Sequence, residues 1–445
     1  MPRFPRMCHG SAKLIYYQRG AADDVIDNDA LRAGLEEALG KIGLRRRVCV
    51  IPPDFTRFHS RGGKITKYLW DYYGAALVDI MPALGTHRPM SEAEIKTMFP
   101  KLPLGLFREH RWHSDTVTIG NVPRAFISKL IETDFEYDWP VQVNQLLCNS
   151  GHDLIVSTGQ VVPHEVAGMA NHSKNILIGT GGREGIHRSH FFAAVYGMER
   201  IMGRVDNPVR ALFDYAMREF AANLPILYAL TVVGSDKEGR PVVRGFFIGD
   251  DRECFENASA LSADVNITVL EKPIKKCVAY LNPEQFCSAW LGNKAIYRTC
   301  MAIADGGELI ILAPGVKKFG EDEKVDSLIR RFGYCGIEKI LLKLRHAKNL
   351  RTNLSAAAHL IHGSSEARFK IVYAPGFLRR DECESVGFGY ARLDAMLEKY
   401  NPSKLKPGWN WVNGEEFYYV DNPALGLWIH AGRMENVKLK RSGRD

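Results

Sequence analysis

Four of the fourteen histidines of the chain lie in one stretch, residues 153–190. They are His164, His172, His187 and His190, with Lys174 among them, and the glycines Gly179, Gly181 and Gly182 follow a short apolar run. Imidazoles transfer protons near neutral pH or bind metals, and glycine-rich turns leave backbone N–H groups open to a phosphate. A loop histidine or a glycine turn is more often structural, so this pattern needs support from other segments.

Two loops earlier in the chain supply that support. Asp54 and Arg57 directly follow an apolar segment that is predicted to be a strand, and His87 and Arg88 lie between a second apolar run and a predicted helix. Ionic side chains at the carboxyl ends of strands lie where open α/β sheets bind ligands. The structural alternative is a surface Asp–Arg turn pair, which would contribute little to stability.

The elements that must position these side chains alternate between strands and helices. Hydrophobic periodicity predicts helices at residues 28–44, 64–74, 191–202, 209–223, 284–304 and 322–332. The capping-box spacing of Ser91 and Glu94 predicts the start of another helix. Strands are predicted at residues 13–17, 47–51, 126–132, 154–156, 176–178, 227–233, 242–248, 276–281, 309–313 and 369–374. This order predicts an α/β fold: two α/β domains with Rossmann-like, mostly parallel sheets and an active-site cleft between them.

The length of the chain, 445 residues, exceeds the usual size of one hydrophobic core. We place a cofactor-binding, catalytic domain at residues 1–268 and a second α/β domain at residues 269–410. The aromatic tail, residues 411–445, is expected to pack back on the first domain.

Composition limits the functions that fit. Hydrophobic residues make up 46% of the chain and charged residues 25%, as in ordinary globular proteins. No apolar run is long enough to span a membrane, and the net charge of +8 is spread among acidic residues without a nucleic-acid-binding motif. The nine scattered cysteines indicate free thiols and a cytoplasmic location. We therefore expect a small-molecule ligand and neither nucleic acid nor a membrane as partner.

Together the motifs resemble the nickel-dependent lactate racemase family, whose members racemise or epimerise 2-hydroxy acids. The resemblance spans most of the chain and is carried by DFTR at residues 54–57, GTHRPMSEAE at residues 85–94 and HEVAGMANHSK at residues 164–174. It implies an isomerase whose cofactor is a nickel-pincer nucleotide, a pyridinium-3-thioamide-5-thiocarboxylic acid mononucleotide that holds nickel.

The resemblance also implies roles for single residues. His190 would bind the nickel, Lys174 would tether the cofactor, and His87 and His164 would be the two acid/base residues. The substrate would be bound by Arg57, Lys294, Asp54 and Arg88, with Arg57 on its carboxylate.

The sequence departs from the family at two places. Asn171-His172-Ser173 stands where members with a tethered cofactor often have glycines. Leu291 stands where a family glutamine falls, three residues before Lys294, which indicates a substrate other than lactate.

The chemistry of the reaction explains why these residue types are needed. The hydrogen on Cα of a 2-hydroxy acid is barely acidic, so its removal as hydride, through a planar 2-keto acid, avoids a carbanion. A hydride acceptor must come from a cofactor, whereas a base on each face of the substrate can be a histidine. Arg57 can bind a carboxylate through two hydrogen bonds, and the glycines Gly179, Gly181 and Gly182 are expected to reach the nucleotide phosphate.

Two other functions fit part of the pattern. His87, His164 and His190 could be three ligands of a zinc or iron hydrolase or lyase, and a non-catalytic protein could bind a sugar acid or a nucleotide at the same loops. Within the racemase interpretation we expect a sugar acid (aldonate) as substrate, because a loop dense in charge, residues 317–324, follows the predicted strand at 309–313.

Overall fold

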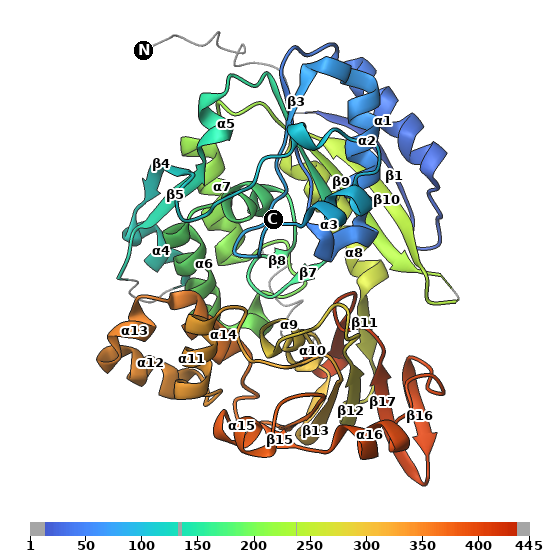
Figure 1. Cartoon of the computed structure of the whole chain (residues 1–445), viewed down its shortest axis with the longest axis vertical. Coiled ribbons are helices and arrows are strands. Elements are labelled where there is room, and N and C mark those ends of the chain that lie inside the picture. Colours follow the sequence, from blue (N-terminus) through green and yellow to red (C-terminus); the bar gives the residue numbers. More distant parts are fainter. Residues whose placement is uncertain (1–13, 132–135, 237, 434–445) are drawn as a thin grey trace, which may run out of the picture.

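The computed structural model of the chain describes residues 14–131, 136–236 and 238–433 (Figure 1). These residues form two α/β units, each built around a central sheet, with helices over the sheet faces. The α/β class predicted from the alternation of strands and helices is confirmed.

In the described residues the first sheet has six strands in the order β1-β10-β9-β6-β2-β3. They are β1 (Ile15–Gly20), β2 (Val48–Ile51), β3 (Leu77–Ile80), β6 (Leu154–Gln160), β9 (Ile226–Ser235) and β10 (Pro241–Gly249). The strands β9, β6, β2 and β3 run parallel, whereas β10 and β1 are antiparallel additions at one edge. Every residue of β6 is buried, as expected for a parallel strand covered on both faces.

The helices of this first half are α1 (Asn28–Ile42), α2 (Gly62–Tyr73), α3 (Glu92–Met98), α4 (Arg124–Ile131), α5 (Gln145–Asn149), α6 (Arg183–Tyr196), α7 (Pro208–Phe220) and α8 (Arg252–Asn266). Shorter elements are the 3-10 helix η1 (Phe55–Ser60), the π-helix η4 (Asn175–Gly179) and two antiparallel strand pairs, β4 (Thr116–Val122) with β5 (Trp139–Asn144) and β7 (Pro163–His164) with β8 (Gly168–Met169). The helix predicted at residues 28–44 is α1, and α3 begins with the capping box of Ser91 and Glu94 that its sequence indicates.

The second sheet, again counted over the described residues, has six strands in the order β15-β14-β13-β12-β17-β16. They are β12 (Ile274–Tyr280), β13 (Ile303–Ala313), β14 (Lys370–Pro375), β15 (Gly389–Tyr390), β16 (Gly408–Val412) and β17 (Glu415–Val420), all parallel to their neighbours except β16. The accompanying helices are α9 (Ala289–Gly292), α10 (Lys294–Thr299), α11 (Glu323–Phe332), α12 (Ile337–His346), α13 (Lys348–Arg351), α14 (Leu354–His362), α15 (Arg380–Ser385) and α16 (Leu393–Lys399).

The tail differs from our expectation in its first part. Residues 411–420 lie in the second sheet, because β17 pairs with β12 along an edge that is otherwise open. The next strand, β18 (Leu427–His430), pairs in parallel with β11 (Ile267–Leu270), which lies between the two sheets in the sequence. Beyond β18, Arg433 forms ion pairs with Glu199 of the first half and Asp305 of the second. The domain division near residue 268 stays a prediction.

Three predicted elements are wrong. The apolar run at residues 176–178 is part of the π-helix η4, and residues 126–131 belong to α4, because short apolar runs do not distinguish a strand from a helix. The helix predicted at 284–304 is split into α9 and α10, and β13 begins at Ile303.

The described cysteines are all free, as expected. Over the same residues, no helix combines the length and apolar character that a membrane span requires.

Candidate active site

A cavity lies at the carboxyl ends of β2, β3 and β6 and is lined from both halves of the chain. Helices α9, α10 and α14 of the second half supply one wall of it. The predicted site residues that line it are Asp54, Arg57, His87, His164, Lys174, Gly179, His190 and Lys294. The structure therefore brings most of the predicted site into one place.

Strand order explains this convergence. β2 and β3 are parallel neighbours, so the loops that follow them begin at the same edge of the sheet. An additional bridge between Pro53 and Ala83 keeps the two loops together. The backbone N–H of Gly85, at a φ of 56° that favours glycine, then donates to the carbonyl of Gly179 at 2.8 Å, which joins the loop of His87 to the π-helix.

His87 forms a close pair with the buried carboxylate of Asp54. Its Nδ1 lies 2.6 Å from Oδ2 of Asp54, and Oδ1 accepts from the hydroxyl and backbone N–H of Thr56. Burial acts to raise the pKa of Asp54, but the charge and hydrogen bond of His87, with the hydrogen bonds of Thr56, lower it to about 2. Because an ionised carboxylate only accepts, Nδ1 of His87 carries a proton, and whenever the ring is neutral its free lone pair is on Nε2.

His164 has the opposite tautomer. The backbone N–H groups of Val166 and Ala167 donate to its Nδ1 at 3.1 and 3.4 Å, so the proton of the neutral ring is on Nε2. Burial holds the pKa of His164 well below its usual value; the carboxylate of Glu165 opposes this shift and Lys174 adds to it. His164 is thus a neutral imidazole that can donate a hydrogen bond from Nε2.

Cations dominate the rest of the cavity. Burial, with the nearby charge of Arg57, lowers the pKa of both Lys174 and Lys294 to about 8. Arg298 is fully buried close by, and its guanidinium lies 4.0 Å from Oε2 of Glu165. A carboxylate ligand would reduce the repulsion among these cations, so the cavity suits an anion.

His190 lies on α6 with its ring orientation fixed. Its Nδ1 donates to the carbonyl of Ile186 at 2.8 Å, one helical turn earlier, which leaves the lone pair on Nε2. Burial lowers the pKa of His190 to about 4, so the ring is neutral at pH 7. A neutral imidazole whose other nitrogen is hydrogen-bonded is the form that binds metals.

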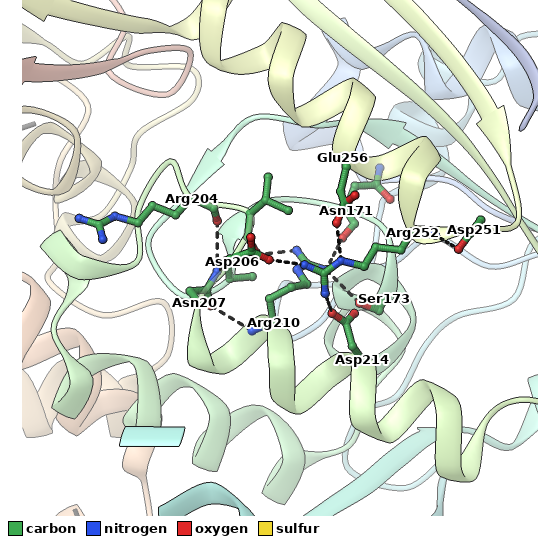
Figure 2. A network of polar contacts seen from close by, with 12 residues as sticks. Asn171, Ser173, Arg204, Asp206, Asn207, Arg210, Asp214, Asp251, Arg252 and Glu256 are labelled. Atoms are coloured by element: carbon green, nitrogen blue, oxygen red, sulfur yellow. Dashed lines mark hydrogen bonds and ion pairs between the residues drawn. The ribbon is translucent and has the colours of Figure 1, made fainter. Parts of the chain in front are cut away.

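The loop before Lys174 takes a glycine-like backbone without glycine. Asn171 and His172 have φ values of 70° and 57°. The buried guanidinium of Arg210, on α7, stabilises this loop: it donates to Oγ of Ser173 at 2.9 Å and to a carbonyl of the same loop at 2.6 Å (Figure 2). Arg210 therefore offsets part of the strain that these positive φ values place on Asn171 and His172.

A second arginine fixes the helix that carries Arg210. Figure 2 shows Arg252, at the start of α8, among the carboxylates of Asp206, Asp214 and Glu256, with which it forms ion pairs. α7 and α8 are thereby joined behind the loop of Lys174.

Arg88 does not line the cavity. Its guanidinium makes two hydrogen bonds with the carboxylate of Glu94, at 2.9 and 2.5 Å, and its side chain is 70% exposed. Arg88 therefore stabilises the start of α3, a role that its position beside His87 in the sequence does not reveal.

Gly181 and Gly182 do not line the cavity either. Gly182 precedes α6, and the first free N–H groups of this helix, those of Glu184 and Gly185, donate to Oε1 of Gln142 at 3.0 and 3.1 Å. The helix end is therefore already capped by a side chain, which leaves Gly179 as the predicted glycine that reaches the cavity.

The charged loop at residues 317–324 is also outside the cavity lining. Polar groups here form hydrogen bonds within the loop and at the start of the next helix. Glu321 accepts from Ser288, and Asp322 caps α11. Asp326, on α11, accepts from the N–H groups of Phe319 and Gly320. This loop therefore gives no support to a sugar acid as the substrate.

Several lining residues were missed by sequence reasoning. They are Gln160, Glu165, Trp290, Tyr297, Ser355, His359 and His362. Two signals were available: Glu165 directly follows His164, and His359 and His362 share one face of a short helix with Ser355.

The three-histidine metal site is not formed. Across residues 14–131, 136–236 and 238–433, no group of three or more His, Cys, Asp or Glu side chains is placed to hold a metal ion. His87, His164 and His190 line the same cavity without forming such a group, so the zinc or iron alternative lacks its ligand set.

Comparisons with known proteins agree with this fold. The chain is similar to a structural-genomics protein from Thermotoga maritima, with 23% identity and a TM-score of 0.77 over 91% of this chain and 98% of that one. It is also similar to the lactate racemase apoprotein from Thermoanaerobacterium thermosaccharolyticum, with 17% identity and a TM-score of 0.68 over 93% and 94% of the two chains. A search of curated protein sequences gives no match. Residues 21–201 match the model of the lactate racemase N-terminal domain, so this part of the chain is identified as such a domain.

Proposed function

We propose that the chain is a racemase or epimerase of a 2-hydroxy acid that works with a nickel-pincer nucleotide. The observation that carries this proposal is the pair of histidines, His87 and His164, that line one cavity as opposite tautomers. A binding protein needs no such pair, which argues against the non-catalytic alternative.

The residues present fit the proposed cofactor. His190 has its lone pair on Nε2 and lines the cavity, so it would bind the nickel. Lys174 lines the same cavity, and its lowered pKa gives it a neutral amine fraction near pH 8, as a covalent tether requires. When bound, this cofactor supplies the hydride acceptor that no side chain provides.

The two histidines handle the proton of the substrate hydroxyl. Nε2 of His87 has the lone pair that accepts this proton from one face, and Asp54 stabilises the imidazolium that results. Nε2–H of His164 donates a hydrogen bond to the oxygen of the planar 2-keto acid from the other face and keeps its proton. The proton that this oxygen takes up when the keto acid is reduced again is the one held by the imidazolium of His87, so both histidines end each passage in the state in which they began.

The substrate carboxylate is bound by cations from both halves of the chain. Arg57 follows β2, and Lys294 begins α10. A carboxylate between them restores the full charge of Lys294, whose pKa burial and Arg57 lower to about 8 in the empty cavity. Substrate binding therefore favours closure of the cavity from both sides. For the rest of the substrate we propose the polyhydroxy chain of a sugar acid.

A racemisation assay tests the proposal. The cofactor-loaded chain is incubated with single enantiomers of lactate, glycerate, malate and several aldonates, and the products are separated by chiral chromatography. We expect inversion at C2 of at least one acid. The His190→Ala variant is the matched control: it should fold, lose nickel measured by elemental analysis, and form no product. A fully nickel-loaded protein that inverts no 2-hydroxy acid would contradict the proposal.

A further inference from the structure

One face of α14 forms part of the cavity wall. Ser355, Ala358, His359 and His362 are spaced three, four and seven residues apart, which places them on the same side of the helix, and all of them line the cavity. α14 packs against α6, the helix of His190 (Figure 1). This wall is therefore adjacent to the proposed reaction centre.

Two polar atoms of this face have no hydrogen-bond partner in the structure. They are Oγ of Ser355 and Nε2 of His362, and both side chains are more than nine-tenths buried. Nε2 of Gln160, which lines the cavity from the first half, is buried and unpartnered in the same way, although its Oε1 bonds His59. Buried polar groups are rarely left without partners because the loss of hydration is costly.

The lack of partners is not shared by every polar side chain on this face of α14, because His359 has them. Its two ring nitrogens are partnered, by the carbonyl of Trp290 at 3.2 Å and the hydroxyl of Tyr334 at 3.4 Å. Its ring also stacks on Trp290, with centroids 4.0 Å apart. His359 is thus part of the framework, whereas Ser355 and His362 line the cavity and each has one polar atom without a partner.

The type of polar group indicates the ligand. An amide N–H₂, a hydroxyl and an imidazole nitrogen form hydrogen bonds with hydroxyl groups, which both donate and accept. The cations that would balance a carboxylate, Arg57 and Lys294, belong to the end of the substrate that reacts. A methyl group, as in lactate, would leave all three atoms without partners.

We infer that Gln160, Ser355 and His362 bind the distal hydroxyls of a polyhydroxylated 2-hydroxy acid and so determine the substrate. This inference rests on the proposed function, because it takes the carboxylate and C2 to lie at Arg57 and the two acid/base histidines.

Calorimetric binding to the chain without cofactor tests the inference apart from catalysis. The probes are D-gluconate and L-lactate, which share the carboxylate and the 2-hydroxyl group. We expect wild-type chain to bind gluconate at least about tenfold more tightly than lactate. Ser355→Ala and His362→Phe should each weaken gluconate binding roughly 2- to 10-fold and leave lactate binding unchanged, since each removes one hydrogen bond. Ser262→Ala, a buried serine that is bonded to Val161 away from the cavity, is the matched control.

Each result decides between the two claims. The inference is overturned if wild-type chain binds gluconate no more tightly than lactate, or binds neither acid. It is also overturned if the variants weaken the binding of both acids equally. In either case, a positive racemisation assay would still support the proposed function. If binding is selective as expected but the loaded chain inverts no 2-hydroxy acid, the proposed function fails while the assignment of the hydroxyl-binding residues remains. Thermal unfolding of each variant identifies any that fails to fold, and for such a variant Ser355→Cys or His362→Gln replaces it in the same measurement.

Discussion

His87 and His164 differ in the kind of group that determines which ring nitrogen carries the proton. For His87 it is a side chain, the carboxylate of Asp54, on a loop that begins where β2 ends. For His164 it is the backbone, through two N–H groups of the turn that follows it. His87 is also 39% exposed, whereas His164 is almost completely buried.

The difference teaches that two residues with one proposed role can respond differently to mutation. A tautomer set by a side chain can be reversed by a single substitution, whereas one set by the backbone persists as long as the turn folds.

The largest effect is expected from Asp54→Asn. An amide can donate to Nδ1 of His87, which would move the ring proton to Nε2 and remove the lone pair that accepts the substrate proton. We expect kcat to fall roughly 10²- to 10⁴-fold in both directions, with nickel content and circular dichroism unchanged. A decrease of less than about threefold would show that Asp54 does not set the tautomer.

Glu165→Gln should separate stability from catalysis. The tautomer of His164 does not depend on Glu165, so we expect kcat to fall less than about tenfold. The buried guanidinium of Arg298 would lose its counter-charge, however, and the free energy of unfolding should fall by roughly 3–5 kcal/mol. Urea denaturation and the racemisation assay on the same preparation measure both quantities. A loss of activity as large as that of Asp54→Asn would remove the contrast between the two sites.

Acid should destabilise the chain through its buried histidines. Burial lowers the pKa of His59 and His110 to about 4 and that of His359 to about 3. The unfolded chain binds protons on these rings near pH 6.5, but the folded chain does so only near pH 4 or below. Stability is therefore complete above pH 6.5 and is lost as pH falls towards 4, by about 1.4 kcal/mol per pH unit for each such histidine. Unfolding midpoints at pH 7.5, 6.0 and 5.0 check the sign; equal midpoints would show that the rings are already solvated.

The smallest effect is expected from Arg88→Ala. The side chain is exposed and pairs with Glu94, so its loss should cost about 1 kcal/mol or less in stability and change kcat/KM by less than about threefold. Steady-state kinetics with the best substrate measure this. A large rise in KM would instead place Arg88 at the substrate, as its position in the sequence suggests.

The sequence predicted the site residues that directly follow a strand in the chain. Asp54, Arg57 and His87 follow strands, and parallel strands bring the loops at their ends together. It could not predict whether a loop group lines the cavity or contacts a neighbour, and Arg88, Gly181 and Gly182 do not line the cavity. Arg88 pairs with Glu94, and Gln142 caps the helix that follows Gly182, through contacts that spacing alone does not reveal.

The wall formed by α14 was missed for a different reason. Its sequence, LSAAAHLIH, is apolar enough to be a core helix, and its polar residues become meaningful only beside α6. Similarly, the positive φ values at Asn171 and His172 are possible because Arg210, far away in the sequence, donates to that loop. Patterns within a short stretch of sequence do not predict tertiary contacts of this kind.

The parallel pair of β11 and β18 has a consequence for how each new molecule is assembled. β18 packs against α10, the helix that begins with Lys294, and the backbone N–H of His430 donates to the carbonyl of Met301 just beyond that helix. During synthesis, β11 leaves the ribosome long before β18, and contacts between distant segments form late. The first sheet can therefore form early, whereas α10 gains its contacts with β18 only after residues 427–430 have been made. The cavity wall that α10 supplies is thus completed later than the first sheet.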